Sequence, residues 1–538
     1  IYINSSVTAV PNSIGERATP SIVSFSDKIY VGEETLDQKI EGKNIISEVK
    51  RFIGLNYDEF IKNDFVKNLN YDVVNKDGKP LIKVLLKEKE EYYSPEQISA
   101  YIIKKMVQIA EDFIDEKEVG VKIKKAVISV PVNFNEYQIE AIEYAAKLAG
   151  IQTIRTIKEP TAAALAYGLG KGLIKNEEYY KKDFSNVPPL ANEEFKKEQN
   201  VLVFDLGGGT FDLTLLNLSK NDNDSLNFNI ISNQGKTHLG GSDFDNKIVD
   251  YCIKTFCDIT GYDEEDIRKD KRACKKLSIK CEAAKKLLSI SNEADINILD
   301  FYNNEYLSVK ITIDLFERLC KDLFKEIKET IMELLKEKEI KPEFIEAIIL
   351  VGGATRMVGI KKLLKSIFED EQKIKDNIDP DVAVAMGATL QSLKIEQNDK
   401  MNFVLQDIIS YNLGISVRNT KIDINEIEKG DLMHPILKKN SRIPSSSEEM
   451  AFNVTLTKSC RDININIYEE NKKYVKDNKK LDLIKIKNCN ILGDISYKLR
   501  FNVDKNSKLT VNVICESLGL NINKEIREEI NCRITENN

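Results

Sequence analysis

The sequence predicts a chain of two parts, an α/β region followed by an antiparallel β module. Three observations lead to this prediction. Short β runs alternate with helical patterns through most of the chain, a polar stretch breaks the pattern near residue 395, and period-two alternation follows it. Because 538 residues exceed the usual size of one domain, two or more compact units are expected.

The α/β region presents strand and helix candidates in turn. The strand candidates are residues 125–132, 200–207, 227–235 and 347–353, and the helix candidates are residues 96–114, 135–150, 272–289 and 313–337. This order is typical of helices packed on sheets. Residues 170–199 have no clear period and contain Pro188 and Pro189, so we expect a surface insertion there.

The β module starts after a polar stretch and a short apolar segment, which together predict an interdomain linker over residues 399–409. Apolar and polar residues then alternate in residues 411–417, 452–458, 462–470, 497–503 and 508–515. An antiparallel sandwich, in which each sheet buries one face, has this pattern. Residues 523–534 have a pattern that fits the start of a helix.

The composition disfavours several classes of protein. A formal net charge of -7 gives no electrostatic basis for nucleic-acid binding, and no apolar run of about 18 residues is present to span a membrane. Nine cysteines without a CxxC pair predict reduced thiols in an intracellular chain, and we expect a cytoplasmic location. Two distant histidines, His238 and His434, argue against a zinc site and against His-dependent nucleophilic catalysis.

The segment VFDLGGGTFDLTLL (203–216) has the layout of a phosphate clamp. A hydrophobic strand ends at Asp205, glycines at 207–209 would let backbone N–H groups approach phosphate oxygens, and Thr210 adds a hydroxyl donor. The carboxylates would repel phosphate unless they act through Mg²⁺ and its waters, so a divalent cation is implied. The simpler alternative is a glycine-rich β-hairpin turn.

Three further segments carry candidate chemistry. In LVGGATRMVGIKKLL (350–364) a β run ends at paired glycines before a helix, which fits either a backing for a nucleobase or ribose or a plain tight turn. In IKEPTAAALAYGLG (157–170), Glu159 lies at a helix start. Either its negative charge interacts favourably with the N-terminal end of the helix dipole, or it acts as a ligand through metal-bound water. THLGGSDFDNKIVD (237–250) places acids after another Gly-Gly turn.

Together these segments resemble the heat shock protein 70 family, chaperones with an actin-like ATPase domain. The matching segments, in the family's order, are GERATPSIVSF (15–25), VKRFIGL (49–55), AVISVPVNFNEYQ (126–138), KEPTAAALAYGL (158–169), VFDLGGGTFDLTLL (203–216), THLGGSDFDN (237–246), KRACKKLSIKCEAAKKLLS (271–289), ILVGGATRM (349–357) and NIDPDVAVAMGA (377–388). The resemblance implies a two-lobed, actin-like nucleotide-binding domain over residues 1–398 and a β-sandwich substrate-binding domain over residues 410–538.

The resemblance also implies roles for individual residues in ATP hydrolysis. Lys50 matches the family's catalytic lysine. Glu159, Asp205 and Asp212 match the catalytic acids, of which Asp205 and Glu159 would hold Mg²⁺ through water. The residues that match the binding site for ATP or ADP are Gly207, Gly208, Gly209, Thr210, Glu282, Lys285, Lys286, Ser289, Gly352, Gly353, Arg356 and Asp381.

The same resemblance assigns residues outside the nucleotide site. Pro131 and Arg155 match positions that couple the nucleotide state to the linker. The residues that fall where the family lines its peptide groove are Tyr411, Leu413, Phe452, Ile463 and Ile465. Inward-facing alternate residues are equally what a sandwich core needs, so both interpretations of this second set stay open.

The sequence also departs from the family pattern. The family's first phosphate loop would precede Ile1, so we expect the sequence to be N-terminally incomplete, and the family's C-terminal helical lid is absent apart from a possible stub. Lys286 stands where the family has an arginine that stacks on adenine, which predicts weaker nucleotide binding. Asn402 replaces an acid of the linker, so altered docking of the linker is expected.

Two functions follow from the resemblance. The first is an ATP-dependent chaperone that binds extended hydrophobic segments of unfolded or nascent polypeptides, with a J-domain co-chaperone and a nucleotide-exchange factor as partners and no direct contact with nucleic acid or membrane. The alternative is a weakly hydrolysing or non-hydrolysing, lidless co-chaperone of the ribosome-associated type. Intact Lys50, Asp205 and Asp212 favour the enzyme, whereas the short β module and altered linker favour the regulator. A sugar kinase of the same fold is disfavoured, because a kinase has no use for the linker and β module.

Overall fold

The structure is a computed structural model of the chain. It describes residues 1–3, 6–35, 40, 42–115, 120–170, 198–221, 225–375, 379–397, 401–417, 431–456, 462–469, 471–487, 493–505 and 507–526. The chain divides into two compact units, residues 1–228 with 232–404 and residues 229–231 with 405–538. No helix in these ranges is both long enough and apolar enough to cross a membrane. Most of the expected insertion, residues 171–197, lies outside the described residues.

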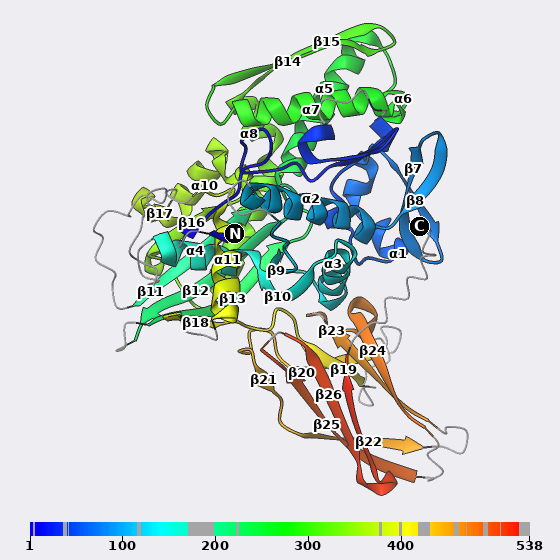
Figure 1. The fold of residues 1–538 in the computed structure, drawn as a ribbon, viewed down its shortest axis with the longest axis vertical. Coiled ribbons are helices and arrows are strands. Elements are labelled where there is room, and N and C mark those ends of the chain that lie inside the picture. The colour runs from blue at the N-terminus through cyan, green and yellow to red at the C-terminus, as the bar shows by residue number, and fades with distance from the viewer. Residues whose placement is uncertain are drawn as a thin grey trace. The chain divides into compact units, whose positions relative to one another are not determined.

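The first unit is a mixed α/β structure, as expected, and its largest described sheet has six strands (Figure 1). Their order is β17 (Ile374–Lys375), β16 (Ala347–Val351), β11 (Glu198–Leu206), β12 (Phe211–Lys220), β13 (Leu226–Lys236) and β18 (Phe403–Gln406). β11 runs parallel to β16 and antiparallel to β12. Residues 201–206 of β11 are all buried, so this strand is a central one covered on both faces.

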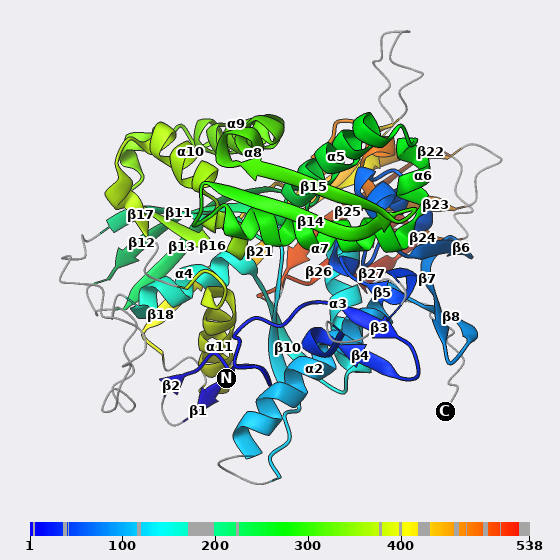
Figure 2. The same ribbon diagram turned by 90° about the horizontal axis from the view of Figure 1, so that it is seen from above.

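Smaller sheets flank the large one. They are β1 (Tyr2–Ile3) with β2 (Ser6–Val7); β3 (Val23–Phe25) with β4 (Ile29–Val31) and β5 (Ile45–Ile46); β6 (Asp72–Lys76) with β7 (Lys79–Leu86) and β8 (Lys89–Tyr93); β9 (Lys125–Val130) with β10 (Gln152–Lys158); and β14 (Glu293–Tyr302) with β15 (Glu305–Thr312). Figures 1 and 2 both show the β14–β15 hairpin lying along helix α7. The alternating burial of β14 explains this contact, because every second side chain faces the helix.

The α-helices of the first unit follow the predicted periodicity with one interruption. They are α1 (Tyr57–Phe60), α2 (Pro95–Asp115), α3 (Glu136–Leu148), α4 (Glu159–Gly170), α5 (Gly241–Thr260), α6 (Glu264–Lys269), α7 (Lys271–Leu287), α8 (Ile313–Leu319), α9 (Lys321–Glu337), α10 (Val358–Phe368) and α11 (Ala383–Glu396). The helix expected over residues 313–337 is divided, because Cys320 leaves helical geometry at φ -97° and ψ 12°. The amphipathic pattern continues across this break, so periodicity alone could not locate it.

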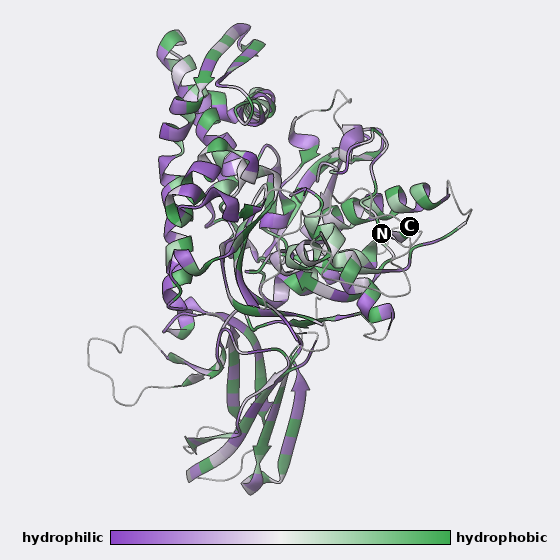
Figure 3. Ribbon diagram, turned by 90° about the vertical axis from the view of Figure 1, so that its left-hand side faces the viewer, coloured by the Kyte–Doolittle hydropathy of each residue, from purple (hydrophilic) through white to green (hydrophobic). Residues whose placement is uncertain are grey.

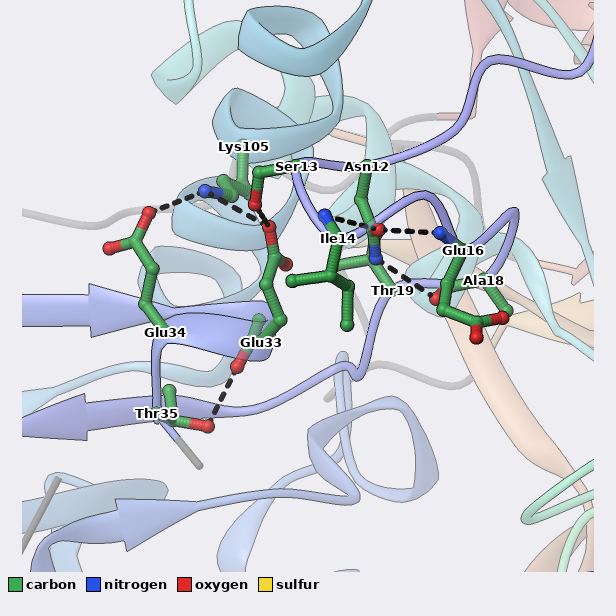
Figure 4. A network of polar contacts seen from close by, with 11 residues as sticks. Asn12, Ser13, Ile14, Glu16, Ala18, Thr19, Glu33, Glu34, Thr35 and Lys105 are labelled. Carbon is green, nitrogen blue, oxygen red and sulfur yellow. Dashed lines mark hydrogen bonds and ion pairs between the residues drawn. The ribbon is translucent and has the colours of Figure 1, made fainter. Parts of the chain in front are cut away.

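A polar network organises the loop that carries the segment GERATPSIVSF (Figure 4). Buried Asn12 accepts hydrogen bonds from the backbone N–H groups of Ile14, at 3.2 Å, and Glu16, at 2.9 Å. Ser13 donates to Glu33 at 2.7 Å, and Lys105 of α2 forms an ion pair with the same carboxylate at 3.6 Å. The loop is therefore held by side chains rather than by a strand pairing.

The second unit consists of two antiparallel sheets, in agreement with the predicted β module. The first has the order β20 (Leu432–Leu437), β19 (Leu413–Val417), β23 (Ile463–Glu469) and β24 (Lys479–Ile486). The second has the order β21 (Ser445–Ser446), β25 (Gly493–Val503), β26 (Leu509–Cys515) and β27 (Leu520–Glu525), and β22 (Met450–Leu456) also pairs with β25. Figure 3 shows the alternation of hydrophilic and hydrophobic residues along these strands.

Side-chain contacts join the two sheets of this unit. The rings of His434 on β20 and Phe452 on β22 lie 5.8 Å apart, and Lys524 on β27 forms an ion pair with Asp482 on β24 at 2.7 Å. Along β26 every second residue is buried, including Val511, so one face of this sheet contributes to a core.

Two stretches beyond residue 395, one expected to begin a helix and the other to be a linker, contain strands. Residues 523–525, expected to begin a helix, instead complete strand β27, because their backbone pairs with the neighbouring strand β26. Residues 527–534 of the expected stub lie outside the described residues. Within the segment expected to be a linker, Phe403–Gln406 forms strand β18 at the edge of the six-stranded sheet, and the Phe403 side chain is buried.

Candidate functional site

The glycine-rich segment forms the turn of a β-hairpin. Residues 207–210 join β11 to β12, and Asp205 and Asp212 are cross-strand partners beside the turn. The Gly207 N–H donates to the carbonyl of Thr210 at 3.0 Å. The segment is therefore a β-hairpin turn, as the simpler alternative expected. This geometry is also compatible with a phosphate loop, because the turn lies at the end of the hairpin.

The three glycines of the turn differ in what the surrounding chain requires of them. A Cβ on Gly209 would lie 2.9 Å from Arg51 Nε, so Arg51 excludes a side chain there. A Cβ on Gly208 would meet no atom within 4 Å, and one on Gly207 would meet nothing closer than 3.7 Å. Packing thus accounts for Gly209 alone. The approach of a ligand to the backbone amides would account for the other two.

Two buried carboxylates lie at the base of the turn. The side chains of Asp205 and Asp212 are 6% and 1% exposed, and neither oxygen of Asp212 has a hydrogen-bond partner among the described residues. Burial raises the pKa of both groups, to about 8 for Asp205, and the negative charge of Glu159 adds to the effect. A buried carboxylate without donors is costly, so Asp212 calls for a cation or a donor from outside the chain.

A lysine and a third carboxylate complete the cluster. Lys50 Nζ lies 2.6 Å from Glu159 Oε1, and Glu159 is the first residue of α4, where the helix dipole favours a negative charge. Glu159 acts electrostatically on both Asp205 and Asp212. The structure therefore brings together all four residues that the resemblance implies are catalytic.

This donor set fits a magnesium ion held through water. Among the described residues, no group of three or more His, Cys, Asp and Glu side chains is arranged to hold a metal ion directly. Mg²⁺ in phosphate-binding sites keeps several waters and uses one or two carboxylates together with phosphate oxygens. Asp205 and the unpartnered oxygens of Asp212 offer such carboxylates.

The second Gly-Gly segment lies at the same edge of the sheet. Because β16 is parallel to β11, the turns after both strands meet there. Gly352 has φ 81°, and a Cβ on it would lie 2.3 Å from the carbonyl oxygen of Leu206. Arg356 Nη2 donates to Asp381 Oδ2 at 2.9 Å, and a Cβ on Gly353 would lie 3.1 Å from the same carboxylate. Glycine is thus required at 352 by the neighbouring backbone, while Gly353, Arg356 and Asp381 form one cluster.

Helix α7 carries three of the residues expected to bind the nucleotide, Glu282, Lys285 and Lys286, and Ser289 lies just beyond its end. Lys285 is buried and donates to Asp245 Oδ2 and to the carbonyl of Gly241, both at 2.8 Å. Lys286 is exposed and pairs with Glu282 one turn away at 2.7 Å. The two adjacent lysines therefore have different surroundings. Lys285 is fixed inside the protein, whereas Lys286 is exposed to solvent.

A pocket lies between α7, α8 and α10. It is lined by Lys285, Leu288, Ser289, Ile313, Phe316, Glu317, Met357, Val358 and Gly359. Lys285 and Ser289 are predicted nucleotide-binding residues, whereas Glu282, Lys286 and Arg356 do not line it. The pocket therefore gathers only part of the expected nucleoside site.

Three charged residues at this site were not singled out from the sequence. Arg51 binds Asp243 with two hydrogen bonds, and Asp245 is the partner of Lys285. Both acids lie in the segment THLGGSDFDNKIVD, whose acids after a Gly-Gly turn were noticed without being assigned a role. Their partners are distant in sequence, so the spacing of residues offered no signal.

The predicted residues outside the nucleotide site lie in two places. Pro131 directly follows β9, and Arg155 is on β10 opposite Val127 of β9. The five predicted peptide-groove residues differ in burial: Leu413, Ile463 and Ile465 are buried, while Tyr411 and Phe452 are half-buried. Buried placement of the first three is what the sandwich-core alternative requires. Residues 418–430 and 457–461 lie outside the described residues.

Comparison with known proteins places the whole chain in one family. The family model described as Hsp70 protein matches residues 1–537. The ribosome-associated molecular chaperones of Eremothecium gossypii and Saccharomyces cerevisiae are 32% and 31% identical to the chain, over 98% of it and 79% of each relative. A heat shock protein of Pyricularia oryzae is 34% identical over 82% of the chain and 66% of the relative.

The family model and the relatives point to the same family. Members of this family bind ATP and ADP and are ATPases. The chain therefore belongs to the Hsp70 family of molecular chaperones.

Proposed function

We propose that the first unit is an ATPase of the two-lobed, actin-like type, and that ATP hydrolysis at the turn of residues 207–210 controls polypeptide binding by the second unit. The observation that carries this proposal is the turn itself. Two of its glycines are not required by packing, and it lies beside two buried carboxylates, one of them without donors. A nucleotide phosphate with its cation would satisfy both features.

The charged residues would divide the work of phosphoryl transfer to water. The Gly208 and Gly209 amides and the Thr210 hydroxyl would orient the phosphates, while Asp205, Asp212 and Glu159 would hold Mg²⁺ through water. Mg²⁺, when bound, neutralises phosphate charge. Lys50, 2.6 Å from Glu159, would place its ammonium beside the terminal phosphate and fix the attacking water. Positioning and electrostatics supply most of the catalysis in such a site.

The nucleoside would lie between α7 and the second Gly-Gly segment. The residues proposed to hold it are Glu282, Lys285, Lys286, Ser289, Gly352, Gly353, Arg356 and Asp381. Lys285 is anchored by Asp245, so its Nζ has one further hydrogen to donate to a ribose hydroxyl. Pro131 and Arg155 would relay the nucleotide state toward β18.

The second unit would bind extended hydrophobic segments of unfolded or nascent polypeptides. Among the predicted groove residues, half-buried Tyr411 and Phe452 have exposed surface that a peptide could contact. The buried residues Leu413, Ile463 and Ile465 would form the core that holds these two side chains in place. A J-domain co-chaperone and a nucleotide-exchange factor are the proposed partners.

A second candidate is a regulatory co-chaperone that binds nucleotide with little or no turnover at the ribosome. The names of the two relatives quoted above favour it, because both are ribosome-associated chaperones. Such a role would place the chain in the cytoplasm. It would share the nucleotide site and differ only in whether Lys50 and the acids support hydrolysis.

A single-turnover ATPase assay separates the two candidates. With Mg²⁺, the enzyme hypothesis predicts hydrolysis that falls at least about 100-fold in Asp205→Asn and is retained in Asp250→Asn, an exposed aspartate of α5. ATP binding without turnover in the wild-type chain would favour the regulator. A wild-type chain that binds no nucleotide would contradict both candidates.

A further inference from the structure

Arg51 is a buried arginine that follows Lys50 directly in the chain. It ends the 3₁₀-helix Val49–Arg51, and its side chain is 2% exposed. Nη1 and Nη2 donate to Oδ1 and Oδ2 of Asp243 at 3.1 Å and 2.7 Å. Two parallel hydrogen bonds between a guanidinium and a carboxylate fix both position and orientation.

Asp243 connects this ion pair to the glycine turn. It lies in the first turn of α5 and also accepts a hydrogen bond from the Gly240 N–H at 2.7 Å. The next two N–H groups of the helix, those of Gly241 and Ser242, donate to the carbonyls of Gly207 and Gly208, both at 2.8 Å. The helix start is therefore bonded to the turn on one side and to Arg51 on the other.

Arg51 also touches the turn directly. A Cβ on Gly209 would lie 2.9 Å from Arg51 Nε and 3.3 Å from its Cγ, so the arginine stem fills the space below this glycine. The ring of Phe65 covers the guanidinium, with 5.6 Å between Cζ and the ring centroid. Arg51 Nε also lies 3.3 Å from Glu48 Oε2, so the guanidinium is held by two carboxylates and by the ring. An arginine so enclosed has few other positions available, because leaving Asp243 would break two hydrogen bonds to a buried charge.

We propose that Arg51 is a positioning residue that fixes the 207–210 turn relative to Lys50. Lys50 reaches Glu159 on one side of its backbone segment, while Arg51 holds Gly209 and the start of α5. The ion pair with Asp243 therefore sets the separation between the lysine and the backbone amides that would meet the phosphates. The inference rests on the proposed nucleotide site. Small errors in the separation between catalytic groups and phosphates lower the rate of phosphoryl transfer strongly.

The test uses the full chain with Arg51→Met, Asp243→Asn and a matched control, Arg268→Met. Arg268 pairs with Asp250 of the same helix α5 at 2.8 Å, in an exposed position away from the turn. Asp243→Asn removes the charge but keeps an oxygen that can accept from Gly240. Amide hydrogen exchange of nucleotide-free chain is followed in peptides that cover residues 203–212, with peptides of the β14–β15 hairpin as reference.

Exchange in residues 203–212 is expected to rise about 10-fold relative to the hairpin peptides in both test variants and to stay unchanged in Arg268→Met. The affinity for ATP is expected to fall about 10-fold while the affinity for adenosine is unchanged, with partial recovery in Arg51→Lys. Unchanged exchange at the turn, or an equal rise in all peptides, would overturn the inference. Faster exchange at the turn in a chain that binds no nucleotide would instead reject the proposed function and leave the positioning role standing.

Discussion

The two units hold their predicted binding residues in opposite environments. In the first unit, the buried carboxylates of Asp205 and Asp212 lie beside glycines that packing does not require. In the second unit, Leu413, Ile463 and Ile465 are buried apolar residues in regular strands, where the sandwich alone accounts for them. Buried acids without donors destabilise a folded chain, whereas buried isoleucines stabilise it. Only the first arrangement calls for a ligand.

The difference shows which kind of residue is informative about function. A polar group that folding leaves unsatisfied needs an explanation outside the chain, so its presence narrows the choice of ligand. An apolar residue at the predicted position of a groove is satisfied by either a core or a peptide. The nucleotide site is consequently supported by energetics, and the peptide site by resemblance and by the partial exposure of Tyr411 and Phe452.

The largest effect is expected from replacing a buried apolar residue of the second unit. Ile465→Ala should destabilise the second unit by about 2–5 kcal/mol, because the side chain is 2% exposed and its removal leaves a cavity. Phe452→Ala should cost less stability and instead weaken the binding of an apolar peptide. Chemical denaturation and peptide anisotropy measure the two effects. An Ile465→Ala chain with unchanged stability and no peptide binding would move this residue from the core to the groove.

The polar side of the comparison predicts an unusual pH dependence. The pKa of folded Asp205 is about 8, against 3.8 for an ordinary aspartate, so the folded chain keeps a proton that the unfolded chain has lost. The stability that goes with protonated Asp205 is fully present below pH 3.8, and it is lost as the pH rises toward 8. Because asparagine has no charge to bury, Asp205→Asn should abolish this fall in stability. It should raise the free energy of unfolding of the nucleotide-free chain at pH 8 by about 1–3 kcal/mol.

Thermal melting between pH 4 and 8 checks this prediction, with Asp250→Asn as the exposed control. If Asp205→Asn lowers the melting temperature at pH 8, the buried carboxylate is already satisfied in the ligand-free protein. The energetic argument for an external cation would then fail.

The glycines allow ligand access to be separated from packing. Gly208→Ala should leave stability unchanged, since its Cβ meets no atom within 4 Å, but should weaken ATP binding about 10-fold by obstructing the phosphate. Gly240→Ala should instead destabilise the first unit, because its Cβ would lie 2.6 Å from the backbone of Gly208. Calorimetric titration with ATP and melting curves distinguish the two outcomes. Full ATP affinity in Gly208→Ala would remove the turn from the nucleotide site.

The smallest effect concerns the exposed lysine of α7. Lys286→Arg should tighten ADP binding about two- to five-fold, because a planar guanidinium stacks on adenine better than an ammonium does. Lys280→Arg, at another exposed position of the same helix, is the control. No gain in affinity from Lys286→Arg would show that this side chain does not cover the base.

Prediction from the sequence succeeded where local pattern decides the outcome. Period-two alternation located strands such as β26, and amphipathic periodicity located helices such as α3, whose start Asn135 caps together with Gln138. It failed at Cys320 and at residues 523–525. There the outcome depends on the packing of neighbouring elements, which residue spacing does not encode.

Sequence patterns were enough to identify the α/β and β character of the two parts, the family, and the acids, lysine and glycines of the candidate site. Which of these residues are coupled follows from the three-dimensional fold. Arg51 pairs with Asp243, which is 192 residues away in the sequence, and the Asp212 carboxylate is buried with no donor among the described residues. Local preferences act over a few residues, whereas burial and ion pairing depend on distances in space that exist only after the chain has folded.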